Sequence, residues 1–293
     1  MTTVARVAAQ AKINLFLRIL AREESGYHAL ETLFARLDLA DDVVVRVAGA
    51  GRSIDCRGAD VGPAESNLAY RAATAYAERT GWPTGFSIEI DKRIPIGGGL
   101  GGGSADAGAV LRALNAMAPA PIAADALMAI AGELGADVPF LTTQSPMALG
   151  WGRGNRLLEL PPLPVRDVAL ICLPIVVSSA AAYGWVAEAR RSRPAGVAST
   201  WRTLDELRSW DGVKALAGND FESEVSRRHQ PVAAVLSSAR SQQAFVASLS
   251  GSGSTVFVLS PPGADPATIS LPPGASLLPT RTAWSVEDVH VIG

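Results

Sequence analysis

The most informative stretch of the chain is residues 95–108, which read PIGGGLGGGSADAG. Six of the seven residues from Gly97 to Gly103 are glycine, although glycine costs more backbone entropy to order than any other residue. A helical pattern follows at once, because apolar side chains recur at i, i+3, i+4, i+7 and i+10 from Ala107 to Met117. Ser104 stands where such a helix would be capped. The stretch therefore predicts a glycine loop that ends at a helix N-terminus.

A glycine loop at a helix N-terminus is suited to bind an anion. Without Cβ atoms the backbone can approach a phosphate closely, and the free N–H groups of the first turn point toward it. The spacing fails the Walker pattern, since Gly103 stands where that pattern needs lysine. It also fails as a dinucleotide motif, because the next segment reads as a second helix. The alternative is a flexible linker, and the ordered patterns on both sides argue against it.

The composition argues against several classes of protein. The chain of 293 residues has a formal net charge of −2, which gives no basic footprint for nucleic acid. Its longest apolar run, residues 168–177, is about half a membrane span, so we expect no membrane partner. No apolar segment follows a basic start, and the two cysteines, Cys56 and Cys172, lie far apart. We therefore expect a cytoplasmic protein without disulfides or a signal peptide.

Strand and helix patterns are mixed along the chain. Alternating or β-branched apolar runs predict strands at 13–20, 41–48, 86–91 and 167–173. Because side chains alternate across a strand, Lys12 and Asn14 fall on one face at the first of these runs. Helical periodicity predicts a helix after Ser66, its expected cap, that stops at Gly81. The proline-rich segment 160–165 is the best candidate boundary, and it would separate residues 1–160 from 161–293.

Lysine is scarce in this chain, which makes each lysine informative. Of 26 basic residues only Lys12, Lys92 and Lys214 are lysine, and the others are arginine. Arginine thus supplies generic positive charge, and the two side chains are not interchangeable at tight sites. Lys12 stands at the start of an apolar strand, where a buried lysine needs an anionic partner. The alternative is a strand-end lysine whose ammonium reaches solvent.

Several segments together resemble one superfamily, the GHMP kinases. The glycine loop resembles the ATP-binding motif of these enzymes. Within the superfamily, five further segments resemble the 4-diphosphocytidyl-2-C-methyl-D-erythritol kinases and occur in the same order. They are AKINLFLRI (11–19), GYHALETLF (26–34), LGADVPFL (134–141), NDFES (219–223) and SGSGSTVFVL (250–259). The AKINL and GYH segments carry the narrower resemblance, since the glycine loop alone indicates only the superfamily.

The resemblance implies an α+β fold of two domains with the active site in the cleft between them. It implies transfer of the ATP γ-phosphate to the 2-hydroxyl of the methylerythritol unit, with Mg²⁺, in the non-mevalonate route to isoprenoid precursors. The small-molecule partners would be ATP and a cytidine diphosphate substrate, and no oligomeric state is implied. The implied ATP loop comprises Pro95, Ile96, Gly97, Gly98, Gly99, Leu100, Gly101, Gly102, Gly103, Ser104 and Ala105.

The resemblance also implies roles for residues outside the loop. Lys12 and Asp137 correspond to the catalytic pair, and Asn14 shares the strand face of Lys12 as an expected substrate ligand. The cytosine-binding residues are matched by Tyr27, His28 and a second aromatic, for which Tyr183 is the first choice and Trp185 the rival.

Local alternatives stay open at several of these positions. Ser104 can cap the helix and also ligate phosphate or Mg²⁺, or it can cap the helix only. Asp137 can accept the proton of a substrate hydroxyl, or it can cap loop amides. Tyr27 and His28 can hold a base by stacking and hydrogen bonding, or they can cover a core edge as turn residues. Residues 250–254 can face a phosphate or form an ordinary hairpin turn.

Two rival functions follow from the same residues. Another GHMP kinase, acting on homoserine or mevalonate, would share the loop, and the GYH segment and the Lys12–Asp137 pairing argue against it. A catalytically silent nucleotide-binding protein would keep the loop and perform no transfer. Release of ADP that depends on the substrate distinguishes both rivals from the reaction implied above.

Overall fold

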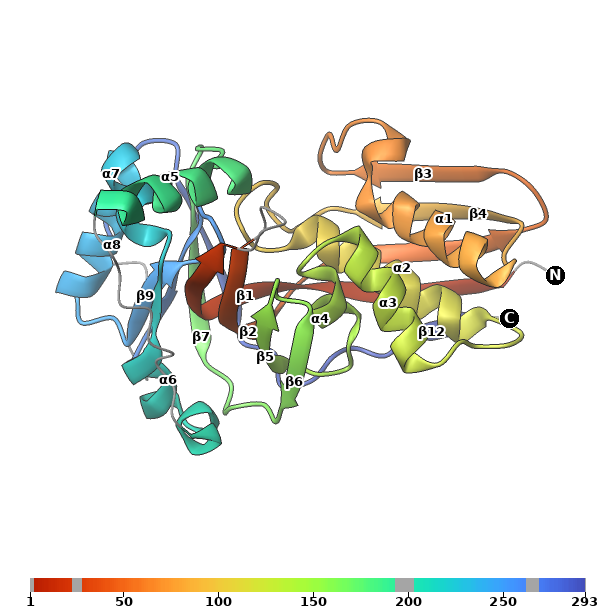
Figure 1. Cartoon of the computed structure of the whole chain (residues 1–293). Helices are drawn as coiled ribbons and strands as arrows, with labels where there is room; N and C mark the ends of the chain where they lie inside the picture. The colour runs from red at the N-terminus through yellow and green to blue at the C-terminus, as the bar shows by residue number, and fades with distance from the viewer. Residues whose placement is uncertain (1–2, 23–27, 193–202, 262–268, 293) are drawn as a thin grey trace.

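Two β-sheets organise the chain in the computed structural model, which describes residues 3–22, 28–192, 203–261 and 269–292 (Figure 1). The larger sheet has the order β12-β1-β2-β4-β3, and β5, β6 and β8 join it through β2, β5 and β1. Its strands are β1 (Val4–Arg22), β2 (His28–Ala48), β3 (Arg52–Arg57), β4 (Gly85–Asp91), β5 (Met147–Gly152), β6 (Arg156–Leu160), β8 (Gly218–Asn219) and β12 (His290–Ile292). The smaller sheet has the order β11-β7-β10-β9, formed by β7 (Asp167–Cys172), β9 (Val246–Leu249), β10 (Val256–Leu259) and β11 (Ser276–Arg281).

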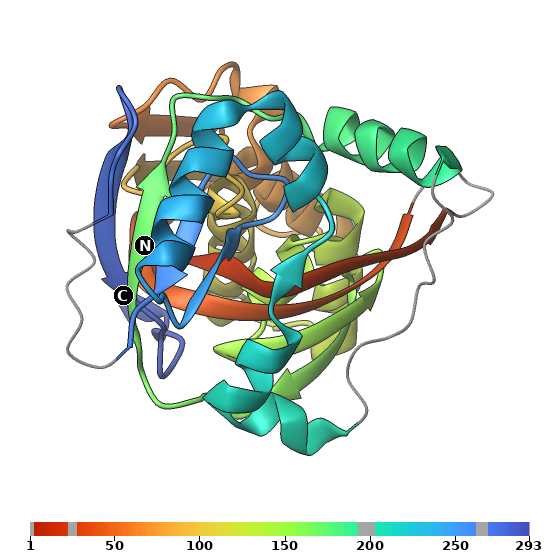
Figure 2. The same ribbon diagram turned by 90° about the vertical axis from the view of Figure 1, so that its left-hand side faces the viewer.

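Helices pack against both sheets, so the α+β class expected above is confirmed. The core of the larger sheet includes α1 (Leu68–Thr80), α2 (Gly102–Met117), α3 (Ala124–Leu134), α4 (Val138–Thr142) and α6 (Trp210–Leu216). The core of the smaller sheet includes α5 (Ser179–Ser192), α7 (Glu222–Arg228) and α8 (Gln230–Ser241), and Figure 2 shows α7 and α8 in front of that sheet. In the part of the chain that is described, no helix is both long and apolar enough to cross a membrane.

Strand β1 runs through both cores. Its residues from Ala5 to Phe16 pack in the core of the larger sheet, whereas Leu17 and Ile19 pack in the core of the smaller one. The strand predicted at 13–20 is therefore too short, and Lys12 lies well inside β1 rather than at its start. The alternation of apolar and polar residues did not predict the ends of this strand, because β1 is buried on both faces around Lys12 and carries bulges on either side of it.

Two predicted helix N-caps are wrong, because an asparagine caps the first helix and a glycine occupies the N-cap position of the second. The N-cap of α1 is Asn67, whose side chain accepts from the Ala69 N–H, and not Ser66. The predicted stop at Gly81 is confirmed, with φ of 74°. Helix α2 starts at Gly102 after Gly101, which has φ of 74°, so Ser104 lies in the first turn and does not cap it.

The boundary expected near residue 160 falls between β6 and β7. The strands before it belong to the larger sheet, and β7 begins the smaller sheet. Strands β8 and β12 then return to pair with β1, so the larger sheet also contains strands from the second part of the chain. Division into residues 1–160 and 161–293 stays a prediction.

Candidate active site

The glycine loop joins β4 to α2 and needs its glycines for two physical reasons. Gly97, Gly99 and Gly101 have φ of 73°, 79° and 74°, the left-handed region that other residues avoid. The loop also packs against a second loop, where the Ser250 hydroxyl donates to Gly99 O at 2.8 Å. A Cβ at residue 99 would overlap the Ser250 backbone. These contacts give the glycine loop one conformation, which argues against the flexible linker.

Residues 250–254 connect the antiparallel strands β9 and β10, so they form a hairpin connection. The same residues also border the site, since Gly251 and Ser252 line two neighbouring cavities. Gly251 N donates to the Asn14 side chain at 2.9 Å, and Asn219 donates to Gly251 O at 2.8 Å. The two interpretations of this segment are therefore compatible.

Two cavities meet beside the glycine loop. The first, of about 400 Å³, is lined by the loop and by Asn67, Leu68, Lys92 and Asp106. The second, of about 220 Å³, is lined by Asn14, Leu30, Thr32, Phe34, Arg153, Tyr183 and Phe221, among others. Six residues belong to both walls: Lys12, Ser104, Asp137, Ser179, Gly251 and Ser252. A group reached from both cavities can act on two ligands at once.

The ion pair predicted from the sequence lies in this shared wall. The Lys12 Nζ is 3.3 Å from Asp137 Oδ2 and donates to Asn14 Oδ1 at 2.7 Å. The Lys12 side chain is 2% exposed, whereas that of Asp137 is 33% exposed. Asp137 precedes α4, yet its side chain makes no capping hydrogen bond. The alternative of a loop-capping aspartate is therefore wrong, and the carboxylate is open to both cavities.

A second buried lysine borders the first cavity. The Lys92 Nζ is 2.5 Å from Asp41 Oδ2 and 2.7 Å from Asp106 Oδ2, and all three side chains are almost fully buried. Burial opposes the charge of Lys92, but the two carboxylates outweigh it, so its pKa is raised. Burial raises the pKa of Asp106 to about 7, Asp41 adds to this, and Lys92 opposes it. The scarcity of lysine pointed to Lys92, but sequence analysis assigned it no partner.

The aromatic residues expected to hold a base differ in their positions. Tyr183 lines the second cavity, and its ring packs edge-on against Phe221 with centroids 4.9 Å apart. Burial and the charge of Asp137 raise the Tyr183 pKa to about 12, so the phenol stays neutral. Trp185, on the same helix, instead lies under the Arg228 guanidinium at 4.7 Å. This geometry favours Tyr183 over Trp185.

Other expected or overlooked residues complete this cavity. Tyr27 lies outside the described residues, and of His28 only the backbone at the start of β2 is described. Arg153 lines the second cavity, although sequence analysis did not select it. It had no local motif to mark it, since this chain uses arginine throughout.

The donor set around the shared wall limits how Mg²⁺ could be held. No group of three or more His, Cys, Asp and Glu side chains suited to a metal is found in the described ranges. The oxygens facing both cavities are those of Asp137 and the hydroxyls of Ser104, Ser179 and Ser252. One carboxylate and a few hydroxyls fit Mg²⁺ that takes its remaining ligands from phosphates and water.

Comparisons with known proteins agree with this geometry. The model of the GHMP kinases N terminal domain matches residues 67–145, and the GHMP kinases C terminal model matches residues 203–271. A 4-diphosphocytidyl-2-C-methyl-D-erythritol kinase from Moorella thermoacetica is 38% identical over 87% of this chain and 89% of its own length.

Solved structures give the same result. A crystal structure of 4-(cytidine 5'-diphospho)-2C-methyl-D-erythritol kinase matches with a TM-score of 0.76 and 33% identity, over 95% of this chain and 99% of that one. A homoserine kinase from Cytophaga hutchinsonii matches with a TM-score of 0.65 over 99% and 97% of the two chains, and at 17% identity it shares the fold only. The chain therefore belongs to the GHMP kinases and, within them, to the 4-diphosphocytidyl-2-C-methyl-D-erythritol kinase family.

Proposed function

We propose that this kinase transfers the γ-phosphoryl group of ATP to the 2-hydroxyl of 4-diphosphocytidyl-2-C-methyl-D-erythritol, a step in the non-mevalonate route to isoprenoid precursors. The observation that carries the proposal is the Lys12–Asp137 ion pair in the wall common to the two cavities. Phosphoryl transfer needs donor and acceptor to meet in line, beside a group that takes the hydroxyl proton. The names of the relatives support this choice of acceptor.

In this proposal the larger of the two cavities takes ATP. The glycine loop, residues 95–105, binds the triphosphate through its backbone N–H groups, assisted by the positive end of the α2 dipole. Asn67 and Leu68 line the same cavity and contact the nucleoside.

The smaller cavity takes the cytidine diphosphate substrate. Tyr183, with Tyr27 and His28, holds the cytosine, and Asn14 binds the substrate near the reacting hydroxyl. The guanidinium of Arg153 suits the diphosphate, because its planar fork matches phosphate oxygens.

Asp137 accepts the proton of the 2-hydroxyl as that oxygen attacks the γ-phosphorus. The new oxygen–phosphorus bond forms, the bond to the β-phosphate oxygen breaks, and ADP leaves. Lys12 orients the carboxylate by their ion pair and adds positive charge beside the transferring group. The hydroxyl of Ser104 and one Asp137 oxygen would hold Mg²⁺ with the phosphates, and the ion neutralises phosphate charge when bound.

The proposed compartment is the cytoplasm, where ATP is available to a biosynthetic kinase. Both cysteines, Cys56 and Cys172, are free thiols, which agrees with a reducing environment.

A substrate comparison tests this function. ADP release is measured with 4-diphosphocytidyl-2-C-methyl-D-erythritol, homoserine and mevalonate at equal concentration, and ³¹P NMR identifies the phosphorylated position. Rapid ADP release with the first substrate alone, and a product phosphate at the 2-position, are expected. Faster release with homoserine or mevalonate would assign another GHMP reaction, and no release above the ATP background would make the chain a silent nucleotide-binding protein.

A pair of variants tests the cytosine site. Tyr183→Ala should raise the KM of the substrate by roughly ten-fold or more, since stacking is worth about 1–3 kcal/mol per base. Trp185→Ala, on the same helix, serves as the matched control and should leave this KM unchanged. The opposite pattern would assign Trp185 as the stacking residue.

A further inference from the structure

Among the described residues, Arg36 is the largest with less than 2% of its surface exposed, and the proposed chemistry does not use it. It stands on β2 directly opposite Lys12 of β1 in the antiparallel register. Side chains of such partners share one face of a sheet. Both side chains reach α4, the five-residue helix that follows Asp137.

The two cations contact opposite ends of α4. Lys12 pairs with Asp137 before the first turn, at 3.3 Å. The guanidinium of Arg36 donates to Phe140 O at 2.9 Å, Thr143 O at 2.9 Å and Ser145 O at 3.1 Å. These carbonyls lie in the last turn of α4 and just after it, where a helix offers its carbonyl groups few N–H donors of its own.

Aromatic packing adds to the hold of Arg36 on this helix. Its guanidinium lies 5.1 Å from the Phe140 ring centroid, a cation–π distance. Phe140 in turn stacks on Phe34 of β2, with centroids 4.8 Å apart, and Phe34 lines the substrate cavity. Arg36 thus contacts α4 through its hydrogen bonds, and it is connected to the substrate cavity through the stacked rings of Phe140 and Phe34.

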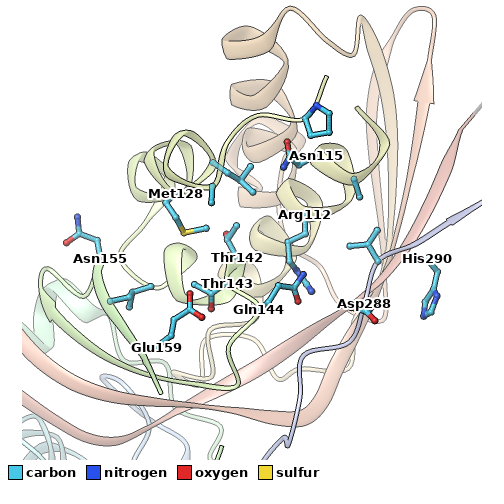
Figure 3. A pocket seen from close by; sticks show the side chains of 16 residues that line it. Arg112, Asn115, Met128, Thr142, Thr143, Gln144, Asn155, Glu159, Asp288 and His290 are labelled. Carbon is cyan, nitrogen blue, oxygen red and sulfur yellow. The ribbon is translucent and has the colours of Figure 1, made fainter. Parts of the chain in front are cut away.

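On its other side, the end of α4 borders a further cavity. This cavity, of about 1110 Å³, is lined there by Thr142, Thr143 and Gln144 (Figure 3). Figure 3 shows these residues between Met128 of α3 and Arg112 of α2. All five residues of α4 are buried, so the helix itself is packed, and the backbone that follows it is held by the hydrogen bonds from Arg36 to Thr143 O and Ser145 O. These hydrogen bonds fix where the chain leaves α4.

We propose that Arg36 is a positioning residue that sets the location of Asp137 by holding the far end of α4. The inference rests on the proposed function, because it assigns Arg36 a role through the proton acceptor. Five residues of helix span only about 7.5 Å, so a shift at the Arg36 end moves the carboxylate. Displacements of about 1 Å at a reacting group can cost about 10²-fold in rate.

A double-mutant cycle on kcat tests the proposal. Arg36→Lys keeps the charge but lacks the fork that reaches three carbonyls, and should lower kcat about ten-fold with ATP affinity unchanged. In the Asp137→Asn background the same substitution should cost less than two-fold, because the group it positions is already gone. An equal fold-loss in both backgrounds would make Arg36 a structural residue only.

Arg112→Lys is the matched control. Arg112 is a buried arginine of the same core that donates to the carbonyls of Ala8 and Glu287 and not to α4. The Arg112→Lys protein should lose thermal stability to a similar extent as Arg36→Lys and should keep the kcat of the wild type. If Arg112→Lys lowers kcat as much as Arg36→Lys does, general loosening of the core explains both, and the proposal is wrong.

A second variant tests the proposal even if Arg36→Lys does not fold. Phe140→Leu removes the ring under the guanidinium and leaves all three hydrogen bonds possible. We expect about a three-fold lower kcat, again abolished in the Asp137→Asn background, and an additive loss would overturn the proposal. Wild-type enzyme without substrate-dependent turnover, or Asp137→Asn with full turnover, would instead refute the proposed function.

Discussion

The two buried lysines beside the glycine loop have similar burial and different partners. Lys12 pairs with one aspartate whose side chain is 33% exposed and open to both cavities. Lys92 lies between Asp41 and Asp106, which are 0% and 5% exposed. A carboxylate that solvent and substrate reach can exchange a proton, whereas an enclosed cluster holds segments together. The difference separates a reactive lysine from a structural one.

The glycine loop lies between these two lysines. A Cβ at Gly101 would be 3.0 Å from Lys12 Cγ, and one at Gly102 would be 3.1 Å from Ile94 Cγ2 and 3.5 Å from Lys92 Nζ. Asp41 also accepts from the N–H groups of Arg93 and Ile94 just before the loop, and Asp106 lies in α2 just after it. The Lys92 cluster therefore ties the two ends of the loop together.

Removing the enclosed lysine should have the largest effect in free energy. Lys92→Met leaves two buried carboxylates without a cation, and breaking a buried pair in this way costs about 3–5 kcal/mol. Thermal or urea unfolding should show this loss, and the folded fraction should retain most of its kcat. A Lys92→Met protein with wild-type stability and greatly reduced kcat would assign Lys92 to the chemistry and remove the contrast.

Replacing the reactive lysine should affect turnover instead. Lys12→Arg places a wider, planar group against Asp137, where it would pair in a fork and occupy the place of the hydroxyl. We expect kcat to fall by roughly 10²-fold or more at saturating ATP and substrate, with ATP still bound. Lys12→Met should lose at least as much.

The control for this prediction is Lys214→Arg. Lys214 is exposed on α6, so its replacement should leave kcat near the wild-type value. Circular dichroism checks that each variant is folded. Folded Lys12→Arg with most of its kcat would mean that Lys12 supplies only generic charge.

Neighbouring glycines of the loop should respond differently. Gly101→Ala forces a Cβ into a left-handed backbone and against Lys12, so it should lower both stability and kcat, the latter by about ten-fold. Gly103→Ala meets only Leu68 Cδ1 at 3.7 Å, and should keep stability while raising the KM for ATP. Calorimetry of ATP binding and thermal unfolding separate the two effects, and unchanged ATP affinity in Gly103→Ala would count against phosphate approach at that residue.

The residues recovered from the sequence are those that local pattern marks. Sequence patterns predict the glycine loop, the helix that follows it and the importance of the rare lysine at position 12. The pairing of Lys12 with Asp137 follows from the family resemblance. Caps were misread, because Ser66 and Ser104 have the right chemistry but Asn67 and Gly101 have the required backbone. The role of Arg36 could not be predicted from the sequence. Its partners at residues 140–145 lie more than 100 positions away, and they are backbone carbonyls, which no side-chain pattern encodes.

The smallest predicted effect concerns pH and the Lys92 cluster. The folded pKa of Asp106, about 7, lies above its ordinary value of 3.8, because the carboxyl is buried and shares its lysine with Asp41. Between about pH 4 and 7 the folded state therefore binds more protons than the unfolded state. Stability contributed by this group falls as pH rises through that window, and the full cost is present above it.

Asp106→Asn removes this titration and keeps the shape of the side chain. Its melting temperature relative to wild type should rise between pH 5 and pH 8 by about 2 °C or more, which corresponds to about 1 kcal/mol. The measurement is thermal unfolding without nucleotide, and Asp42→Asn is the control, because Asp42 pairs with Arg93 at the exposed surface. If the difference between Asp106→Asn and wild type is the same at both pH values, Asp106 is ionised throughout in the folded protein. Lys92 would then hold two charged carboxylates, and the two lysine sites would differ in access alone and not in proton binding.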